Sequence, residues 1–439
     1  MQNLFGDFQA VTAKAWKNNI IRDLKGEAYE TLIWANENGF NIEPFYTSEN
    51  QSVSYEPVFT HSDWEVAVSG KSKDSKELNS QLLEQLNSGA SSISINVGDL
   101  DLDIALNEVK LNFIHSIFHV NKNNASHLKS YLLKNYELHE LNCSVFYKKI
   151  GNQQDLEDWG KTILFFKDFE RIRTISIDVL QHHNRNCLAY YEIALLFSKL
   201  VEYIECHSLK SDWPSSKIAI KVGVSSDYFI QMAKLRAIRR LWLVLKNENG
   251  LKNDIHLIVE TGLTNKSISE NYNNLLRTTT EAMAAVSGGC NELIVNEFDV
   301  LFETEKKLSA RMAVNQQLIL KHESYFDKMA DIACGSFYVE AITDALAEKA
   351  LEALKYFEQQ GGYFKCSEKN VFSEDIARQA VTKEKLFKEE KQIAIGVNKF
   401  RNAKEKIELP ASSISMLQQL LINNPVLNYE LERYLSQNA

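Results

Sequence analysis

Hydrophobic residues along this chain form short, strand-length runs, separated by longer stretches in which they recur at helical spacing. Six of these runs are rich in isoleucine and valine, which is typical of buried parallel strands. These runs are SSISINV (91–97), SIFHVN (116–121), RTISIDV (173–179), KIAIKVGV (217–224), DIHLIVE (254–260) and NELIVN (291–296). WEVAVSG (64–70) and SFYVEAI (336–342) are weaker candidates for the two ends of the set.

The stretches between these runs predict amphipathic helices. In TDALAEKALEALKYFEQQGG (343–362), Thr343 can cap the first turn and the two glycines end the helix. Its apolar stripe consists of Leu346, Ala350, Leu354 and Phe357. Roughly eight strand–helix units over about 300 residues fit a (β/α)8 barrel better than an open sheet. We therefore expect an α/β fold of the TIM-barrel type.

Two segments fall outside the predicted barrel, which we place at residues 56–379. Residues 1–55 form an N-terminal arm that contains one helix-like stretch. Residues 380–439 form a C-terminal helical extension that is mostly polar. The two appendages are candidate places for subunit contacts.

The composition argues against a nucleic-acid-binding, membrane or secreted protein. The chain has 439 residues, 44% of them hydrophobic, and a formal net charge of -9 without a basic tract, which argues against nucleic acid or an anionic membrane as partner. Its start lacks the features of a secretory signal, and no apolar run approaches the roughly 20 residues that span a bilayer. The six cysteines form no CxxC pair. We expect a cytoplasmic protein with reduced thiols.

General catalytic motifs are scarce. Neither GxxxxGK[ST] nor a GxGxxG after a strand occurs, so nucleotide sites have no support. HSIFH (115–119) spaces two histidines by four but lacks the glutamate of HExxH and lies in a predicted strand. DIHLIV (254–259) is similar to the cobalt-binding DxHxxG phrase, but Val259 stands in place of the glycine. We interpret both histidine phrases as core strands.

Several longer phrases carry a more specific signal. RTTTEAMAAVSGGCNELIVNEFD (277–299), DIACGSFYVEAITDALAEKA (331–350) and LRAIRRLW (235–242) resemble segments of the methylmalonyl-CoA mutase family in the correct order. The resemblance extends outward to residues 16–49, to GVNKF (396–400) and to LPASSISMLQQL (409–420). It therefore covers nearly the whole chain.

The resemblance implies a coenzyme A-binding barrel that active relatives follow with a separate cobalamin-binding domain. This sequence ends at Ala439, about where that domain would begin. We therefore expect no cobalamin-binding domain and no cofactor in this chain.

The residues that the family uses for chemistry are replaced. Aligned on TISI (174–177), the family's catalytic histidine becomes Gln181, and His182 and His183 are out of register with it, as expected for packing or exposed residues. Ile294 replaces a histidine that lies against cobalamin, and Lys217 replaces a coenzyme A-binding arginine. The segment that threads coenzyme A in the family has no counterpart.

The resemblance, taken with these losses, implies a non-catalytic small subunit of a heterodimeric methylmalonyl-CoA mutase. Its partner would be the full-length catalytic subunit, which holds adenosylcobalamin and interconverts (R)-methylmalonyl-CoA and succinyl-CoA in propionate metabolism. No residue of this chain is then expected to be catalytic, to bind a cofactor or to bind a metal. Two alternatives stay open: an active acyl-CoA mutase barrel whose cobalamin domain is a separate chain, and a stand-alone scaffold barrel.

Overall fold

The computed structural model describes residues 11–50, 55–148, 150–166, 168–169, 171–205, 218–251, 254–301, 306–402, 404 and 424–438. Lys217 and the phrase at 409–420 lie outside these residues.

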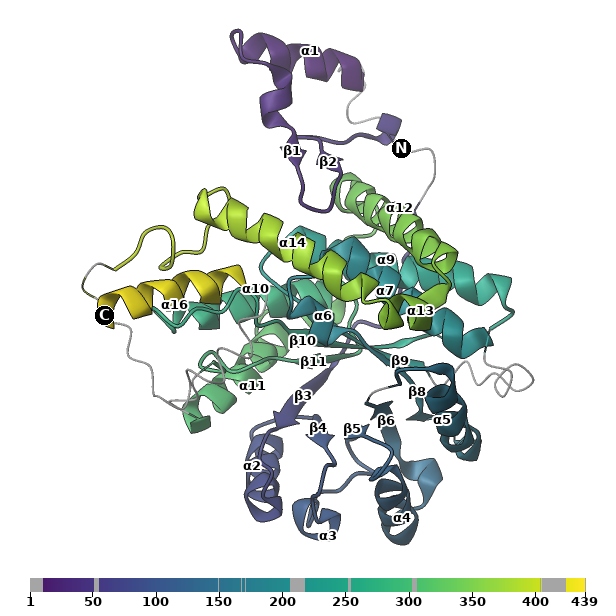
Figure 1. Cartoon of the computed structure of the whole chain (residues 1–439). Coiled ribbons are helices and arrows are strands. Elements are labelled where there is room, and N and C mark those ends of the chain that lie inside the picture. The colour runs from purple at the N-terminus through teal and green to yellow at the C-terminus, as the bar shows by residue number, and fades with distance from the viewer. Residues whose placement is uncertain are drawn as a thin grey trace, which may run out of the picture.

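The centre of the molecule is a parallel β-barrel, so the predicted α/β TIM-type fold is confirmed (Figure 1). Every neighbouring pair in its sheet is parallel, and β11 pairs with β3 to bring the last strand beside the first. The strands are β3 (Glu65–Gly70), β4 (Ser92–Asn96), β5 (His115–Val120), β6 (Asn142–Tyr147), β7 (Ile172–Arg173), β8 (Ile175–Asp178), β9 (Ile218–Val224), β10 (His256–Thr261) and β11 (Glu292–Ile294).

Strands β7 and β8 are two parts of one barrel strand, separated only by Thr174. β7 pairs with β6 and β8 pairs with β9, so the barrel has eight strand positions and is nearly closed. Among the described residues, no ladder joins β6 to β8. Two helix side chains bind the backbone at this seam: Trp159 Nε1 donates to the Thr174 carbonyl at 3.0 Å, and the Tyr203 hydroxyl donates to the Ser176 carbonyl at 3.3 Å.

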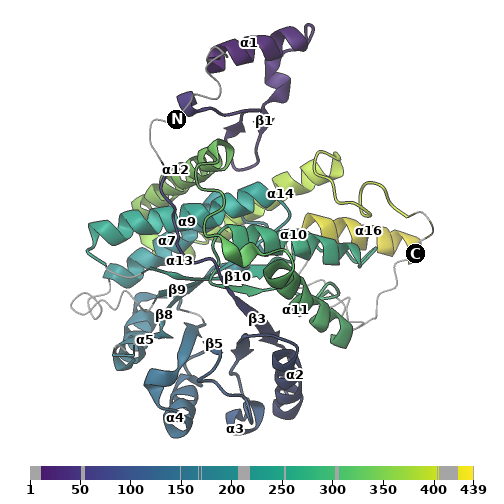
Figure 2. The same ribbon diagram turned by 180° about the vertical axis from the view of Figure 1, so that it is seen from behind.

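Helices surround the barrel in the order expected of strand–helix units (Figures 1 and 2). Aspartate side chains begin three of them: Asp74 accepts from the backbone of Lys76 and Glu77, Asp101 from that of Ile104, and Asp227 from that of Ile230. The helices that follow strands are α2 (Ser75–Asn87), α3 (Leu102–Ala105), α4 (Ala125–Asn135), α5 (Gln153–Phe165), α7 (Ala189–Glu205), α9 (Tyr228–Glu248), α10 (Asn273–Ser287) and α11 (Lys306–His322).

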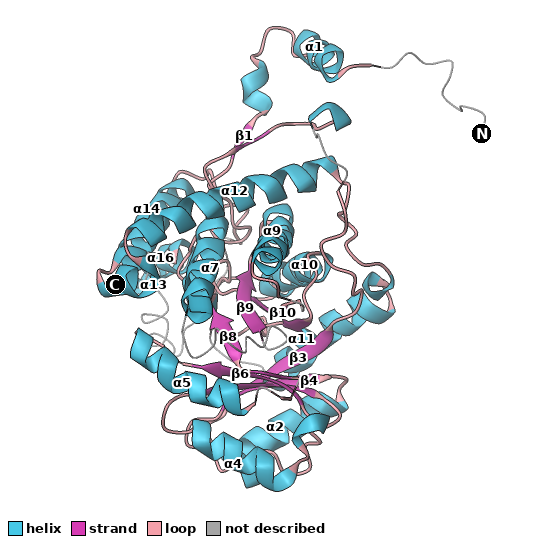
Figure 3. Ribbon diagram, turned by 90° about the vertical axis from the view of Figure 1, so that its right-hand side faces the viewer, coloured by secondary structure: helices cyan, strands magenta, loops and turns pink. Residues whose placement is uncertain are grey.

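A second layer of helices lies outside this ring. The long helix α12 (Phe337–Gln359) packs across α7 and α9, which separate it from the strands (Figure 3). Buried ion pairs join the layers, since Arg236 Nη2 of α9 donates to Glu340 Oε1 of α12 at 2.7 Å. The remaining helices are α13 (Gly362–Glu368), α14 (Val371–Lys388) and α16 (Pro425–Asn438).

The structure corrects one predicted strand. SFYVEAI (336–342) is not a strand, because α12 already begins at Phe337. Thr343 therefore lies inside the helix rather than at its cap, and its hydroxyl donates to the Val339 carbonyl at 2.7 Å. The strand that takes its place in the set of eight is β6, NCSVFY, which was not predicted from the sequence pattern.

The N-terminal segment projects from the body as an arm (Figure 1). It carries α1 (Ala13–Asp23) and a short antiparallel pair formed by β1 (Trp34–Ala35) and β2 (Asn41–Ile42). The base of the arm is anchored, since Ile42 is buried and Glu37 pairs with Lys383 at 3.1 Å. By contrast, α1 has no buried residue.

The two faces of the barrel strands differ. Outward side chains such as Val66 and Phe118 join one large core with the surrounding helices. Inward side chains form a small separate cluster, because successive residues of a strand point to opposite faces. This inner cluster fills the middle of the barrel with Ala67, Ile117, Phe146, Ala219, Ile258 and Ile294.

Among the described residues, the helices are all too short or too polar to cross a membrane.

Candidate functional site

Gln181, which the sequence resemblance predicts to stand in place of a catalytic histidine, lies just past the carboxyl end of β8. It belongs to the short helix α6 (Leu180–His183) and its side chain is exposed. Its amide nitrogen lies 3.5 Å from Nε2 of the neighbouring His182. A primary amide offers hydrogen bonds but cannot exchange a proton near neutral pH. The position therefore lacks the acid–base group that a histidine would supply.

His183, two residues further on, is a buried structural residue. Its Nδ1 lies 3.0 Å from Glu192 Oε2, and Lys234 Nζ donates to the same oxygen at 2.8 Å. The ring lies so close to two strand ends that a Cβ at Gly223 or Gly262 would overlap it. His183 therefore attaches α6 to the barrel rim, in keeping with the packing role expected for it.

The surroundings of His183 keep the imidazole neutral and the carboxylate charged. Burial, with help from Lys234, lowers the pKa of His183. Burial alone would raise the pKa of Glu192, but Lys234 and His183 together lower it to about 2. Lys234 and Glu192 thus form a buried ion pair, and the neutral His183 is hydrogen-bonded to its carboxylate.

Ile294 lies inside the barrel and is 1% exposed, as a member of the inner cluster. Towards the carboxyl ends of the strands, an ion pair between β9 and β10 fills the next part of the barrel interior. Lys221 Nζ of β9 lies 2.8 Å from Glu260 Oε2 of β10, and Asn296 donates to Glu260 Oε1 at 3.1 Å. Apolar side chains and this ion pair thus occupy the barrel axis.

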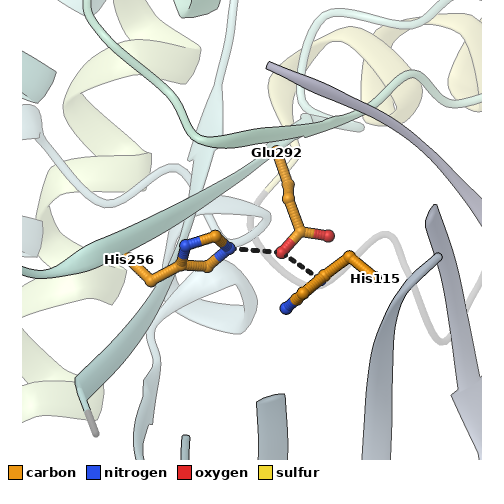
Figure 4. A group of neighbouring side chains, drawn as sticks. All are labelled: His115, His256 and Glu292. Carbon is orange, nitrogen blue, oxygen red and sulfur yellow. Dashed lines mark hydrogen bonds and ion pairs between the residues drawn. The ribbon is translucent and has the colours of Figure 1, made fainter. Parts of the chain in front are cut away.

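A polar cluster lies at the opposite, amino-terminal end of the axis, where β5, β10 and β11 begin. Figure 4 shows its three side chains, His115, His256 and Glu292. Glu292 Oε1 of β11 lies 2.5 Å from His115 Nδ1 of β5 and 2.5 Å from His256 Nε2 of β10. The second carboxylate oxygen accepts from the Ser92 hydroxyl at 2.6 Å. Because β5 and β11 are not neighbours in the sheet, His115 and Glu292 meet across the barrel interior.

Two histidines and a carboxylate have the composition of a transition-metal site. The proton positions argue for a hydrogen-bonded cluster instead. Arg173 Nη1 lies 3.2 Å from His115 Nε2, and since a guanidinium only donates, that nitrogen must accept. A neutral His115 then carries its proton on Nδ1, the atom that faces Glu292, and has no lone pair there for a metal.

Burial controls the charge of this cluster. Burial, with the positive charge of Arg173, lowers the pKa of His256 to about 3. Burial alone would raise the pKa of Glu292, but the contacts with His115 and His256 lower it. Glu292 is therefore an anion enclosed by hydrogen-bond donors.

Sequence reasoning found two of these residues separately but not their association. His115 and His256 stand out in HSIFH and DIHLIV, while His119, the partner suggested by spacing, lies further along β5 and is 3.4 Å from the Ser94 hydroxyl. Glu292 escaped sequence reasoning. The available signal was that all three are inward positions near the start of their strands.

Comparison with known proteins agrees with the phrases quoted from the sequence. A sequence model of the family described as methylmalonyl-CoA mutase matches residues 155–421. The chain is 29% identical to the protein named methylmalonyl-CoA mutase small subunit of Porphyromonas gingivalis over 445 residues, which cover 92% of this chain and 72% of that protein.

Two further relatives match over a shorter region. The methylmalonyl-CoA mutase large subunit of Propionibacterium freudenreichii subsp. shermanii is 33% identical over 238 residues, 52% of this chain and 32% of its own length. A probable mitochondrial methylmalonyl-CoA mutase of Caenorhabditis elegans is 32% identical over 243 residues, 54% of this chain and 33% of its own length. The aligned region thus spans about a third of these two relatives.

Proposed function

Because this chain belongs to the methylmalonyl-CoA mutase family, we propose that it is a non-catalytic small subunit that stabilises a catalytic mutase subunit. The observation that carries the proposal is the nature of the side chains at the two positions where the resemblance predicts the family's histidines. One holds Gln181, exposed on α6, and the other holds Ile294, buried in the interior. Neither side chain can donate or accept a proton during a rearrangement beside a thioester.

The filled barrel supports the same conclusion. The inner apolar cluster, the Lys221–Glu260 pair and the Glu292 cluster follow one another along the axis. Side chains that pack against one another leave the barrel a stable scaffold while removing room for an elongated ligand. Such a barrel is suited to binding another protein.

The proposed partner is the full-length catalytic subunit, with adenosylcobalamin bound there and not in this chain. That subunit would interconvert (R)-methylmalonyl-CoA and succinyl-CoA in the cytoplasm, as a step of propionate metabolism. Relatives named small and large subunit support a heterodimer of this kind. Duplicated subunits tend to keep an ancestral two-fold contact, so the interface is proposed to be pseudo-symmetric.

The arm is proposed to take part in the interface. Its helix α1 has 11 residues, none buried, and Trp16 is 51% exposed. An isolated helix of this length is marginally stable in water unless an apolar face packs against something. The partner subunit would supply that surface.

The test is to produce the chain alone and together with a full-length mutase subunit, and then to measure the mass of the complex, the cobalamin absorbance and the isomerisation of succinyl-CoA. The proposal expects a one-to-one complex whose activity is lost when the catalytic histidine of the large chain is replaced. Turnover by this chain with a separate cobalamin-binding polypeptide would instead support the split-mutase alternative. Failure to form any complex would favour a stand-alone scaffold.

A further inference from the structure

A groove of about 740 Å³ lies on the side of the barrel opposite the arm, among α3, the end of α4 and residues 106–113 (Figure 1). Two large apolar side chains line it and face the solvent: Phe113 is 81% exposed and Leu133 is 50% exposed. Among the described residues, no other large apolar side chain is as exposed as Phe113. Single exposed apolar residues are normal, but two that line one groove indicate a surface that binds another molecule.

The backbone that carries Phe113 is held in place by its neighbours. The Tyr136 hydroxyl donates to the Val109 carbonyl at 3.0 Å, which joins this segment to the end of α4. Asn79 Nδ2 of α2 donates to the Asn107 carbonyl at 2.7 Å. The exposure of Phe113 therefore results from a defined conformation, and little conformational entropy is lost when a partner binds there.

This side of the barrel carries a single, thin layer of helices. α3 has only four residues, whereas α7 and α9 on the other side are covered in turn by α12. α3 and α4 form the edge of the molecule farthest from α1 (Figure 2). Among the described elements, none closes the groove from outside, so it is accessible to another protein.

The groove is acidic. Its lining carries four carboxylates and two lysines, those of Asp103, Glu108, Glu137, Glu140, Lys110 and Lys134. Lys134 Nζ lies 3.0 Å from Asp103 Oδ2, so the charges of this pair cancel. Three carboxylates then stand against one lysine, and none of the three forms an ion pair with another described residue. α4 also ends at the groove, and the carboxyl end of a helix carries a partial negative charge.

We propose that this groove docks a basic segment of a third protein, which places an apolar side chain against Phe113 and Leu133 and its lysines or arginines against the three carboxylates. The apolar anchor supplies affinity, while complementary charge selects the segment and speeds its association. An acidic or uncharged segment would leave the carboxylates without partners. The site goes beyond the proposed function, because the groove lies opposite the arm and stays open in a heterodimer that the arm holds (Figure 1).

Fluorescence anisotropy of a labelled peptide, titrated with the full chain at low ionic strength, tests the proposal. The peptide has about 12 residues, lysine and leucine around one central phenylalanine, and measures roughly 18 Å as a helix. One saturable site is expected, and salt should weaken it because exposed charges are screened. Two matched peptides, one with glutamate for lysine and one with serine for the apolar residues, should bind at least about tenfold more weakly. Equal binding by either peptide, or no saturable site, would overturn the proposal.

Substitutions in the chain locate the binding. Phe113→Ala should weaken it about tenfold, since the change removes the apolar anchor from an exposed position where folding is not affected. The matched control is Val381→Ala, 67% exposed on α14, which should leave binding unchanged. Glu140→Gln should weaken binding about threefold and reduce its dependence on salt, whereas Glu348→Gln, exposed on α12, should not. Equal effects of the groove and control variants would contradict the assignment.

Two other occupants of the groove are distinguished by the state of the chain. A dimer of the isolated chain that Phe113→Ala dissociates would assign the groove to a second copy and overturn the proposal. The peptide is expected to bind the complex with a full-length mutase subunit as well as it binds the free chain. Loss of peptide binding in that complex would assign the groove to the subunit interface instead. Failure to form the complex bears on the proposed function alone, because the titration of the free chain does not depend on it.

Discussion

Arg173 fixes the proton position of His115, because its Nη1 lies 3.2 Å from His115 Nε2 and can only donate. The imidazole is thereby oriented with Nδ1 towards Glu292, 2.5 Å away. Arg173 thus determines which nitrogen of His115 carries the proton that faces Glu292. The cluster ties β5, β10 and β11 together across the barrel, and its loss has measurable consequences for stability.

Replacing Glu292 by glutamine should destabilise the barrel. The substitution keeps the shape but removes the charge that His115 and His256 surround, and it places an amide donor against donors. We expect a loss of about 2 kcal/mol in the free energy of unfolding, measured by urea denaturation. The matched control is Glu157→Gln on the exposed face of α5, which should change stability by less than about 0.5 kcal/mol. Equal stability of the two variants would contradict the role of the cluster.

Stability should fall on acidification. The folded pKa of His256 is lowered to about 3, whereas the unfolded ring titrates near 6.5, so the unfolded state binds more protons between these values. Stability is therefore full above about pH 6.5 and is lost as the pH falls towards 3. The lowered pKa of Glu292 acts in the same direction below about pH 4.3.

The thermal midpoint measured at several pH values between about 7 and 4 checks this slope. His256→Gln removes the titrating ring, and the variant should lose less stability over the same interval. His139→Gln, in a short turn on the surface, serves as the control and should keep the wild-type slope. A slope that His256→Gln leaves unchanged would show that another group governs acid sensitivity.

Removing the buried charge of Glu192 should also be costly. Glu192→Gln leaves Lys234 buried without its carboxylate, and breaking a buried pair in this way typically costs about 3–5 kcal/mol. The comparison variant is Glu205→Gln at the exposed end of the same helix, expected to be neutral. Urea unfolding midpoints and expression in soluble form provide the measurement.

Restoring a histidine at position 181 should not restore activity. Gln181→His returns one proton-exchanging group, but Ile294 and the filled interior stay as they are. The side chain is exposed, so thermal stability should change by less than about 0.5 kcal/mol. Turnover of succinyl-CoA by the variant, supplied with a separate cobalamin-binding chain, would sink the non-catalytic interpretation.

Replacing Trp16 in the N-terminal arm should weaken subunit assembly without changing the stability of the isolated chain. Trp16→Ala removes a large exposed apolar side chain from α1, so the unfolding midpoint of the chain alone should not move. Affinity for the catalytic subunit should drop about tenfold or more, as for loss of a central aromatic contact. Val244→Ala, exposed on α9, is the control; if it weakens the complex as much as Trp16→Ala, the arm has no special part.

Seven of the eight strand positions could be predicted from the sequence because their apolar runs are rich in Ile and Val. β6 escaped since its inward positions include Asn142 and Ser144, which break the apolar run. FYVEAI was misassigned because a short apolar run fits a strand or a helix equally well. Val339, Ile342 and Leu346 are buried at the helical spacing of three and four residues, and all three lie within α12.

The cluster of His115, His256 and Glu292 could not be predicted from the sequence, because it depends on the geometry of the closed barrel. His115 and Glu292 are far apart in sequence and lie on strands that do not pair, so only closure of the barrel brings them together. The prediction that Gln181 and Ile294 replace histidines rests only on the resemblance to the family. Nothing in residue spacing alone distinguishes those two positions.

The seam at Thr174 has a consequence for how the barrel opens. A barrel with eight complete ladders has no edge, whereas here the carbonyls of Thr174 and Ser176 at the seam accept hydrogen bonds from Trp159 and Tyr203. Backbone amides along this strand should therefore exchange with deuterium sooner than those of β4 or β9, which have partners on both sides. We therefore expect local unfolding of the barrel to begin at this seam.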